Sequence, residues 1–215
     1  MDINLSKFPE EVVEALAWPF DFAIREIPND PFWFSVRPKM SLTPIAGEGA
    51  GGIYATVDNT GEILFVDSEG AGSIVAPTLE AFILILVCHP YWRDLLKFSG
   101  SGSLQEMRRT LPLAEREYFE HQREAVGLAD SLRTALHLPD KRDMVDVLHA
   151  SVTSSEQKIQ LLAPDGSKLR SLFNKFTAMN NPAWRRMAEQ SAAPNGGPAT
   201  PAGKSGVTEG PPSVS

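Results

Sequence analysis

The chain has 215 residues, 42% of them hydrophobic, which is enough for one moderate domain or for a domain with an appendage. Its formal net charge is −7, and the excess of acid lies in residues 1–100, where 14 Asp and Glu face 6 Lys and Arg. Residues 101–190 are nearly balanced, with 12 against 13. Binding to phosphate backbones needs clustered Lys and Arg, so the acidic first half argues against a nucleic-acid partner and suits a basic protein.

Three features bear on the compartment. Cys88 is the only cysteine, so no internal disulfide can form, which suits a reducing cytosol. The opening residues, MDINLSKFPEE, lack the basic region and apolar core of a secretory signal. The longest apolar run, residues 81–88, is about a third of the length that a membrane helix needs. We therefore expect a cytoplasmic protein without a membrane segment.

The first fifty residues predict one helix followed by β-structure. Residues 8–18 have apolar side chains on one helical face, with Ser6 available as the cap and Pro19 as the stop. The glycine-rich sequence AGEGAGG, residues 46–52, indicates an irregular loop. The strands expected here are residues 20–27, 32–36 and 42–45, with a turn at residues 28–31.

Residues 51–100 have the clearest local pattern. Two β-prone runs, residues 53–57 and 63–66, flank the turn sequence DNTGE and predict a hairpin. Residues 72–76 predict a further strand of the same antiparallel meander. Thr78 then caps an apolar helix that reaches Cys88, and helical structure resumes over residues 91–98.

The second half predicts a helical and mixed region. The sequence SGSGS, residues 99–103, has the composition of a linker, and residues 104–136 predict helix in two pieces around Pro112. The remaining expectations are strands at 144–152 and 159–162 separated by polar TSSEQK, a turn at 164–167, and short helices at 168–179 and 182–189.

Together these patterns predict an α+β fold, with an antiparallel or mixed sheet packed against helices. We expect a domain over residues 1–100 and a helical or mixed extension over residues 101–190 that packs on it. Residues 191–215 are rich in Pro, Gly and Ser and predict a disordered tail.

Candidate catalytic and metal sites are few. Cys88 and His89 could form a nucleophile and its base, but neighbouring residues on a helix point about 100° apart. A buried thiol and a histidine that complements the helix dipole explain the pair better. No close pair of His or Cys has metal-ligand spacing, and AGEGAGG lacks the lysine of a phosphate loop. We therefore predict no catalytic residue, metal or cofactor.

Acidic and aromatic residues offer candidate contacts instead. Asp67 and Glu69 follow a strand, at a position where binding sites often lie, and no base or nucleophile accompanies them. Aromatic side chains are frequent interface anchors, but their apolar spacing here favours the core. The aromatic set consists of Trp33, Tyr54, Tyr91 and Trp92.

An ordered set of segments resembles the SUKH superfamily, the Smi/Knr-like proteins. Its opening helix begins Phe8-Pro9-Glu10-Glu11, and the remaining segments are residues 51–55, 63–70, 79–86 and 90–96. The resemblance covers residues 8–98 and implies an α+β fold without catalytic residues. Bacterial members are mostly immunity proteins that bind and neutralise toxins, often nucleases, whereas a fungal branch regulates cell-wall synthesis and signalling.

Two function classes follow. The first is an immunity protein that binds a protein toxin, with Glu48, Tyr54, Asp58, Asp67 and Glu69 as candidate contacts. The second is a regulatory scaffold of the same fold, which holds its partner through residues 104–190 or the tail. An enzyme would rest on the loop of Asp67 and Glu69 alone, and the oligomeric state stays open.

Overall fold

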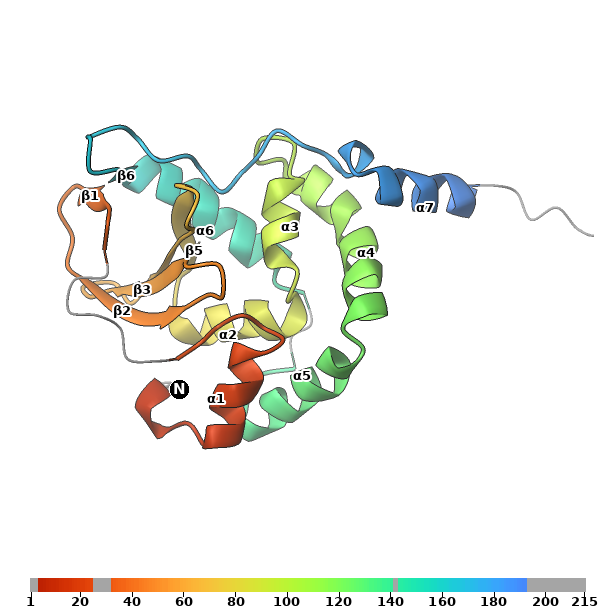
Figure 1. Ribbon diagram of the computed structural model, residues 1–215, viewed down its shortest axis with the longest axis horizontal. Coiled ribbons are helices and arrows are strands. Elements are labelled where there is room, and N and C mark those ends of the chain that lie inside the picture. The colour runs from red at the N-terminus through yellow and green to blue at the C-terminus, as the bar shows by residue number, and fades with distance from the viewer. Residues whose placement is uncertain (1–3, 25–31, 141–142, 193–215) are drawn as a thin grey trace, which may run out of the picture.

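The computed structural model describes residues 4–24, 32–140 and 143–192, and it has an α+β fold (Figure 1). The largest sheet is a four-stranded antiparallel meander whose spatial order follows the chain. Its strands are β2 (Leu42–Gly47), β3 (Ile53–Val57), β4 (Ile63–Val66) and β5 (Gly72–Ala76). The predicted bounds of β3, β4 and β5 are therefore confirmed, and Gly61 turns the hairpin with a φ of 74°.

Strand β2 continues into the glycine-rich segment that the sequence analysis assigned to a loop. Ala46 and Gly47 pair with Tyr54 and Ile53 on one side, and Gly47 exchanges two backbone hydrogen bonds with Ala23 on the other. These bonds satisfy the backbone at the end of β2 and offset the low strand propensity of glycine. A strand was predicted over residues 20–27, and its described part, residues 20–24, forms the single β-bridge of Ala23 with Gly47. The rest of that strand and the predicted turn at 28–31 lie outside the described residues.

The two faces of the sheet are covered by different layers. The helices pack on one face, around the buried rings of Tyr54, Phe65 and Phe82. On the other face, Leu64, Val66 and Ile74 form a second core with a two-stranded antiparallel ribbon. The strands of this ribbon are β1 (Ser35–Arg37) and β6 (Gln160–Leu162). Because β1 comes from the first half of the chain and β6 from the second, the two halves together build this ribbon.

The helices of the first half agree with their sequence signals. In α2 (Leu79–Cys88), the Thr78 hydroxyl accepts a hydrogen bond from the Ala81 N–H at 3.1 Å, and residues 82–87 are all buried. In α1 (Glu10–Ala17), Pro9 occupies the cap position, whereas Ser6 bonds to Asn4. The predicted Ser6 cap was therefore wrong. The helical turn after Pro90 is α3 (Trp92–Lys97).

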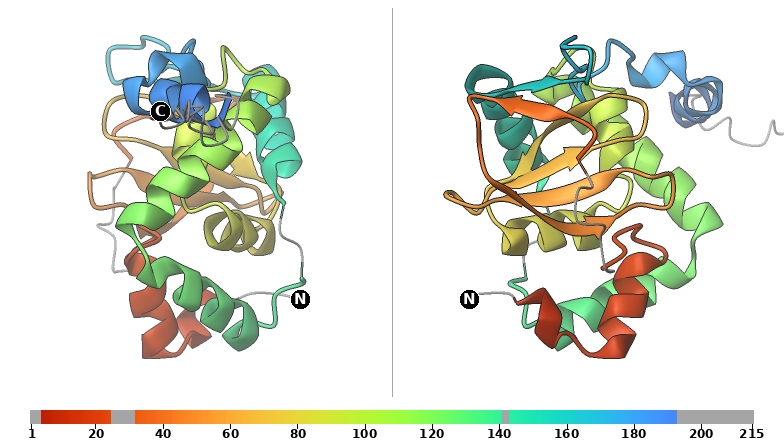
Figure 2. Two further views of the ribbon diagram at one scale, coloured as in Figure 1. Left: turned by 90° about the vertical axis from the view of Figure 1, so that its right-hand side faces the viewer. Right: turned by 60° about the vertical axis from the view of Figure 1, so that its left-hand side comes forward.

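Pro112 does not divide the next helix. Helix α4 (Leu104–His121) runs through it and ends at Gln122, and α5 (Glu124–Ala135) then packs beside α1 (Figure 2). Proline lacks one helical N–H, but Met107, Thr110 and Ala114 are buried on both sides of it. This packing keeps the helix continuous across the missing bond.

The expected strand at residues 144–152 is a helix. Helix α6 (Val145–Lys158) includes the polar TSSEQK sequence and packs along β5. Its buried residues, Val145, Leu148, Val152 and Ser155, fall on one helical face. The Ile74 N–H donates to the Ser155 hydroxyl at 2.8 Å, so the polar end of the helix also belongs to the packed layer.

The SGSGS sequence is not a free linker. Ser99 is fully buried, and the N–H groups of Gly100 and Ser101 donate to Phe176 and Asn174, each at 2.7 Å. The Ser103 hydroxyl then caps α4. Glycine lets the backbone take the positive φ that this tight turn requires.

The segment after the turn at residues 164–167 is extended, where a helix was expected over 168–179. Arg170 exchanges backbone hydrogen bonds with Gly70 and Gly72, at 2.9 and 3.0 Å, which a helix would forbid. The short helix η2 (Ala178–Asn180) and α7 (Pro182–Ala192) follow. Residues 193–215, the body of the predicted tail, lie outside the described residues. Among the described helices, none is long and apolar enough to cross a bilayer.

Candidate functional site

The loop between β4 and β5, residues 67–70, is rigid for its length. The Asp67 carboxylate accepts hydrogen bonds from the N–H groups of Glu69 and Ala71, at 2.9 and 2.8 Å. Gly70 has a φ of 83°, which favours glycine. Asp67 thus shapes the turn, while the Glu69 side chain, 82% exposed, projects from it.

Two segments distant in sequence brace this loop. The Arg170 guanidinium donates to the Glu69 carbonyl at 3.0 Å, and its backbone bridges Ala71. From the other side, Trp33 lies against Gly70, because a Cβ atom placed on that glycine would meet Trp33 Cη2 at 3.9 Å. Trp33 is 38% exposed and packs edge-on against Phe34. An aromatic ring, a cation and a carboxylate therefore share one surface.

A cleft of about 590 Å³ opens beside the loop. Helix α3 and residues 170–175 form its other walls, where the chain crosses from β6 towards α7 (Figure 1). Its apolar lining consists of Phe65, Ala71, Leu96, Leu172 and Phe173. Its charged lining consists of Asp67, Glu69, Arg93, Lys97, Arg170 and Lys175. The cleft therefore combines an apolar floor with charges of both signs.

One of these cations, Arg93, is held by acidic residues behind the cleft. Its Nη2 donates to the Asp21 carboxylate at 2.7 Å, and its Nη1 forms an ion pair with Glu48. The Glu48 side chain is only 4% exposed, so Arg93 balances a buried carboxylate. This pairing fixes α3 to the end of β2.

Two of the five predicted contact residues are buried, which corrects their assignment. Tyr54 is fully buried among Phe22, Phe65 and Phe82, and burial together with the charge of Asp21 raises its pKa. Glu48 is 3% exposed and paired with Arg93. Neither side chain can reach a partner on this surface. Burial of the tyrosine follows from strand alternation, whereas burial of Glu48 had no sequence signal.

The other three predicted contacts are accessible but do not form one group. Asp58 lies at the turn between β3 and β4, where hydrogen bonds from Ser41 and Thr43 lower its pKa. Asp67 and Glu69 instead line the cleft. The structure therefore brings together two of the five, and it adds cations that the sequence analysis did not connect with them.

The aromatic set divides in the same way. Tyr54, Tyr91 and Trp92 are core residues, as their spacing predicted. Trp33 is the exception, and its place beside the loop could not be read from its apolar neighbours. Arg170 lies 101 residues after Glu69, and no local pattern marks that contact.

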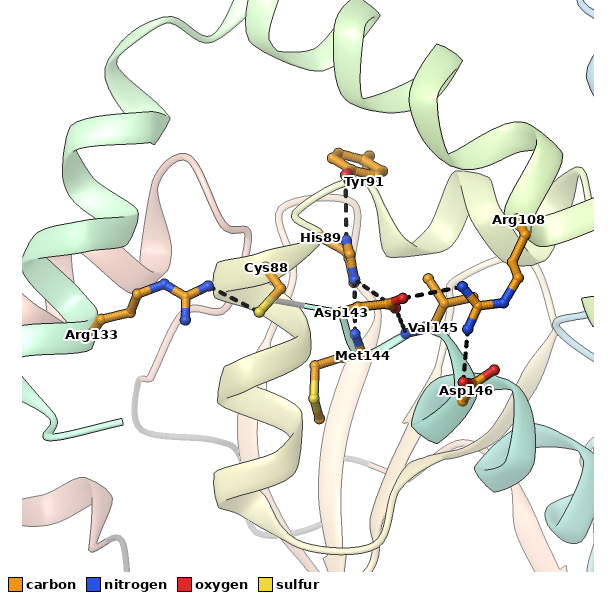
Figure 3. A network of polar contacts seen from close by, with 9 residues as sticks. All are labelled: Cys88, His89, Tyr91, Arg108, Arg133, Asp143, Met144, Val145 and Asp146. Atoms are coloured by element: carbon orange, nitrogen blue, oxygen red, sulfur yellow. Dashed lines mark hydrogen bonds and ion pairs between the residues drawn. The ribbon is translucent and has the colours of Figure 1, made fainter. Parts of the chain in front are cut away.

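A second polar cluster surrounds His89, at the junction of α2 and α3 (Figure 3). The ring accepts a hydrogen bond from the Met144 N–H at Nε2, 3.0 Å away, and its Nδ1 lies 3.3 Å from the Tyr91 hydroxyl. Neutral histidine satisfies both contacts if Nδ1 carries the proton. Asp143 lies 3.9 Å from Nε2, and its carboxylate also binds Arg108.

The cluster does not form a catalytic pair with Cys88. Figure 3 shows the His89 ring directed at Met144 and the thiol directed at Arg133, whose Nη2 lies 3.0 Å from the sulfur. Burial lowers the pKa of His89 to about 4, with Asp143 opposing the shift. The expectation that His89 complements the helix dipole as a cation is therefore wrong, because the ring is neutral near pH 7.

No set of three or more His, Cys, Asp or Glu side chains within residues 4–24, 32–140 and 143–192 is arranged to hold a metal ion. The cleft is thus the strongest candidate binding site of the described chain. Comparisons of the chain with protein-family models, curated sequences and solved structures find no match.

Proposed function

We propose that this chain is a protein-binding module whose partner docks on the surface formed by Trp33, Glu69, Arg170 and the adjoining cleft. The observation that carries the proposal is the partly exposed Trp33 ring, which packs against the braced loop beside the exposed Arg170. Tryptophan and arginine dominate the binding energy of many protein interfaces. A rigid loop also loses little conformational entropy when a partner binds.

We further propose that the partner is a toxin and that the chain acts as its immunity protein. The resemblance of residues 8–98 to the SUKH superfamily supports this assignment. Inhibition by binding needs no catalytic group, and the cleft offers a stable docking surface rather than a nucleophile with its base. The excess of acidic residues in residues 1–100 suggested a basic partner, but the docking surface carries cations from α3 and from residues 170–175.

Co-expression tests this function directly. Each product of the genes that neighbour this one is expressed alone and together with the full chain, and growth and complex formation are measured. We expect one toxic product whose toxicity is lost on co-expression and which co-purifies at a near-equal molar ratio. If no product is both toxic and bound, the immunity function is wrong.

Matched variants locate the interface. The double variant Trp33→Ala with Arg170→Ala should abolish protection while its thermal unfolding stays cooperative, because both side chains are partly exposed. The control is Trp18→Ala with Arg116→Ala, which removes an equally large exposed ring and an exposed arginine elsewhere. Equal losses from the two double variants would place the interface away from the cleft.

A further inference from the structure

The charges around the cleft differ in sign from those of the whole chain. The chain has a net charge of −7, yet the cleft lining has four cations, Arg93, Lys97, Arg170 and Lys175, and two carboxylates, Asp67 and Glu69. A locally positive cleft concentrates negative ligands even on an acidic protein.

The cations of the cleft differ in whether they form ion pairs within the protein. Arg93 is bound to Asp21 and Glu48, and Arg170 lies 4.0 Å from the Glu69 carboxylate. In contrast, Lys97 and Lys175 are exposed, and within the described residues neither has a carboxylate oxygen within 4.0 Å. These two lysines are the cations of the cleft lining without an ion pair among the described residues, and Lys97 Nζ lies 5.6 Å from the centre of the Phe98 ring.

The carboxyl group whose charge acts on Lys97 is Asp94, on the same helix. Burial raises the pKa of Asp94 above its usual value, and the charges of Lys97 and Arg93 oppose this shift. Of the two carboxylates in the cleft lining, Asp67 accepts hydrogen bonds from the N–H groups of Glu69 and Ala71, and Glu69 lies 4.0 Å from the Arg170 guanidinium. Because both lysine side chains are exposed, their ammonium groups stay open to carboxylates from a ligand.

The shape of the site narrows the class of ligand. The cleft volume of about 590 Å³ suits a short segment with a few side chains. Its floor is apolar, with Phe65, Leu96, Leu172 and Phe173. A nucleic acid would need a longer basic track along its phosphates. An acidic peptide that also carries apolar side chains matches both the floor and the lysines.

We propose that the cleft binds an acidic segment of the protein partner, whose carboxylates pair with Lys97 and Lys175 and whose apolar side chains rest on Leu172 and Phe173. This inference rests on the proposed function, because it names the part of the partner that docks. The partner therefore contributes negative charge at this site, whatever its overall charge. Residues 193–215 of the chain itself, with one lysine and one glutamate, offer little negative charge for the same role.

The test uses the full chain and two labelled peptides of equal length, one alternating glutamate with leucine and the other lysine with leucine. Fluorescence polarisation at low and physiological salt measures their affinity. We expect saturable binding of the glutamate peptide, weaker at higher salt, and at least tenfold weaker binding of the lysine peptide. No binding of the glutamate peptide, or equal binding of both, would overturn the inference.

Charge reversal identifies the cations. Lys97→Glu with Lys175→Glu should weaken glutamate-peptide binding by about tenfold, since two exposed pairs together contribute up to one such factor. The control, Lys7→Glu with Arg123→Glu, changes the net charge equally at exposed positions outside the cleft lining. If both double variants lose the same affinity for the glutamate peptide, overall charge explains the loss, and the inference that Lys97 and Lys175 bind the peptide is wrong. A short DNA duplex that competes better than the glutamate peptide would also contradict a protein segment as the ligand.

The inference and the proposed function can fail separately. If the co-purifying toxin binds the Lys97→Glu, Lys175→Glu variant as tightly as it binds the native chain, the acidic-segment inference is wrong and the function stands. If the glutamate peptide binds the cleft as expected but no toxin is found, the inference stands and the immunity function falls.

Discussion

The cleft and the His89 cluster lie at the two ends of one short stretch, residues 88–97, and they use polar groups in opposite ways. At the His89 cluster the ring is buried, and the Met144 N–H, the Tyr91 hydroxyl and Asp143 surround it. At the cleft, Lys97 is exposed and has no close carboxylate among the described residues. Matched buried groups hold a fold together, whereas unmatched exposed charges are free to bind a partner.

Arg93 shows whether a charged residue of the cleft stabilises the fold or is available to bind a partner. It lines the cleft, yet it is bound to Asp21 and the buried Glu48. Arg93→Ala should lower the free energy of unfolding by about 4 kcal/mol, because removal of one partner leaves a buried carboxylate uncompensated. Urea unfolding measures the loss.

The controls separate folding from binding at Arg93. Adding Glu48→Gln to Arg93→Ala should restore part of the stability, since the buried charge is then gone. Lys97→Ala should change the free energy of unfolding by less than about 0.5 kcal/mol. If Arg93→Ala and Lys97→Ala are equally stable, Arg93 belongs with the free cations of the cleft.

The His89 cluster should make stability depend on pH. The pKa of His89 falls from 6.5 to about 4 on folding, so between these values the unfolded chain binds a proton that the folded chain does not. The contribution of neutral His89 is therefore complete above pH 6.5 and is lost as the pH falls to 4. The loss should be on the order of 3 kcal/mol.

The comparison with His89→Gln isolates this titration. Glutamine does not titrate, so the free energy of unfolding of the variant should change less between pH 6.5 and 4 than that of the native chain. Urea unfolding across that range measures both. Parallel curves for the two proteins would show that His89 does not contribute. Binding of the glutamate peptide at pH 7 should be the same in both.

The elements that the sequence predicted correctly are those with local signals. The DNTGE turn fixes the β3–β4 hairpin, and the Thr78 cap with its apolar run fixes α2. Residues 144–152 were assigned to a strand from their apolar content, whereas the burial of Val145, Leu148 and Val152 has helical spacing. The hydrogen bonds that order SGSGS come from Asn174 and Phe176, which no local pattern indicates.

The candidate site was predictable only in part, for the same reason. The position of Asp67 and Glu69 after a strand marked the loop correctly as a surface feature. The groups that complete the site, Trp33 and Arg170, come from segments paired through β1 and β6 and through the Ala71 bridge. Such contacts depend on tertiary packing and not on neighbouring residues.

The smallest expected effect concerns the turn at residues 99–103, where Gly102 lies against Phe173 of the cleft floor. Gly102 has a φ of 89°, and a Cβ atom there would lie 2.9 Å from Phe173, a residue of the cleft floor. Gly102→Ala should therefore lower the free energy of unfolding by about 2 kcal/mol. It should also weaken binding of the glutamate peptide, because the added methyl group displaces the Phe173 ring.

Gly61→Ala is the matched control, because Gly61 has a φ of 74° but open space around it. It should cost about 1 kcal/mol through backbone strain alone and leave peptide binding unchanged. Thermal unfolding and polarisation on both variants separate the two effects. If Gly102→Ala is less stable but binds the peptide normally, Phe173 contributes to the packing of the fold and not to the binding surface. The apolar contacts of the peptide would then come from Leu172, Leu96 and Phe65.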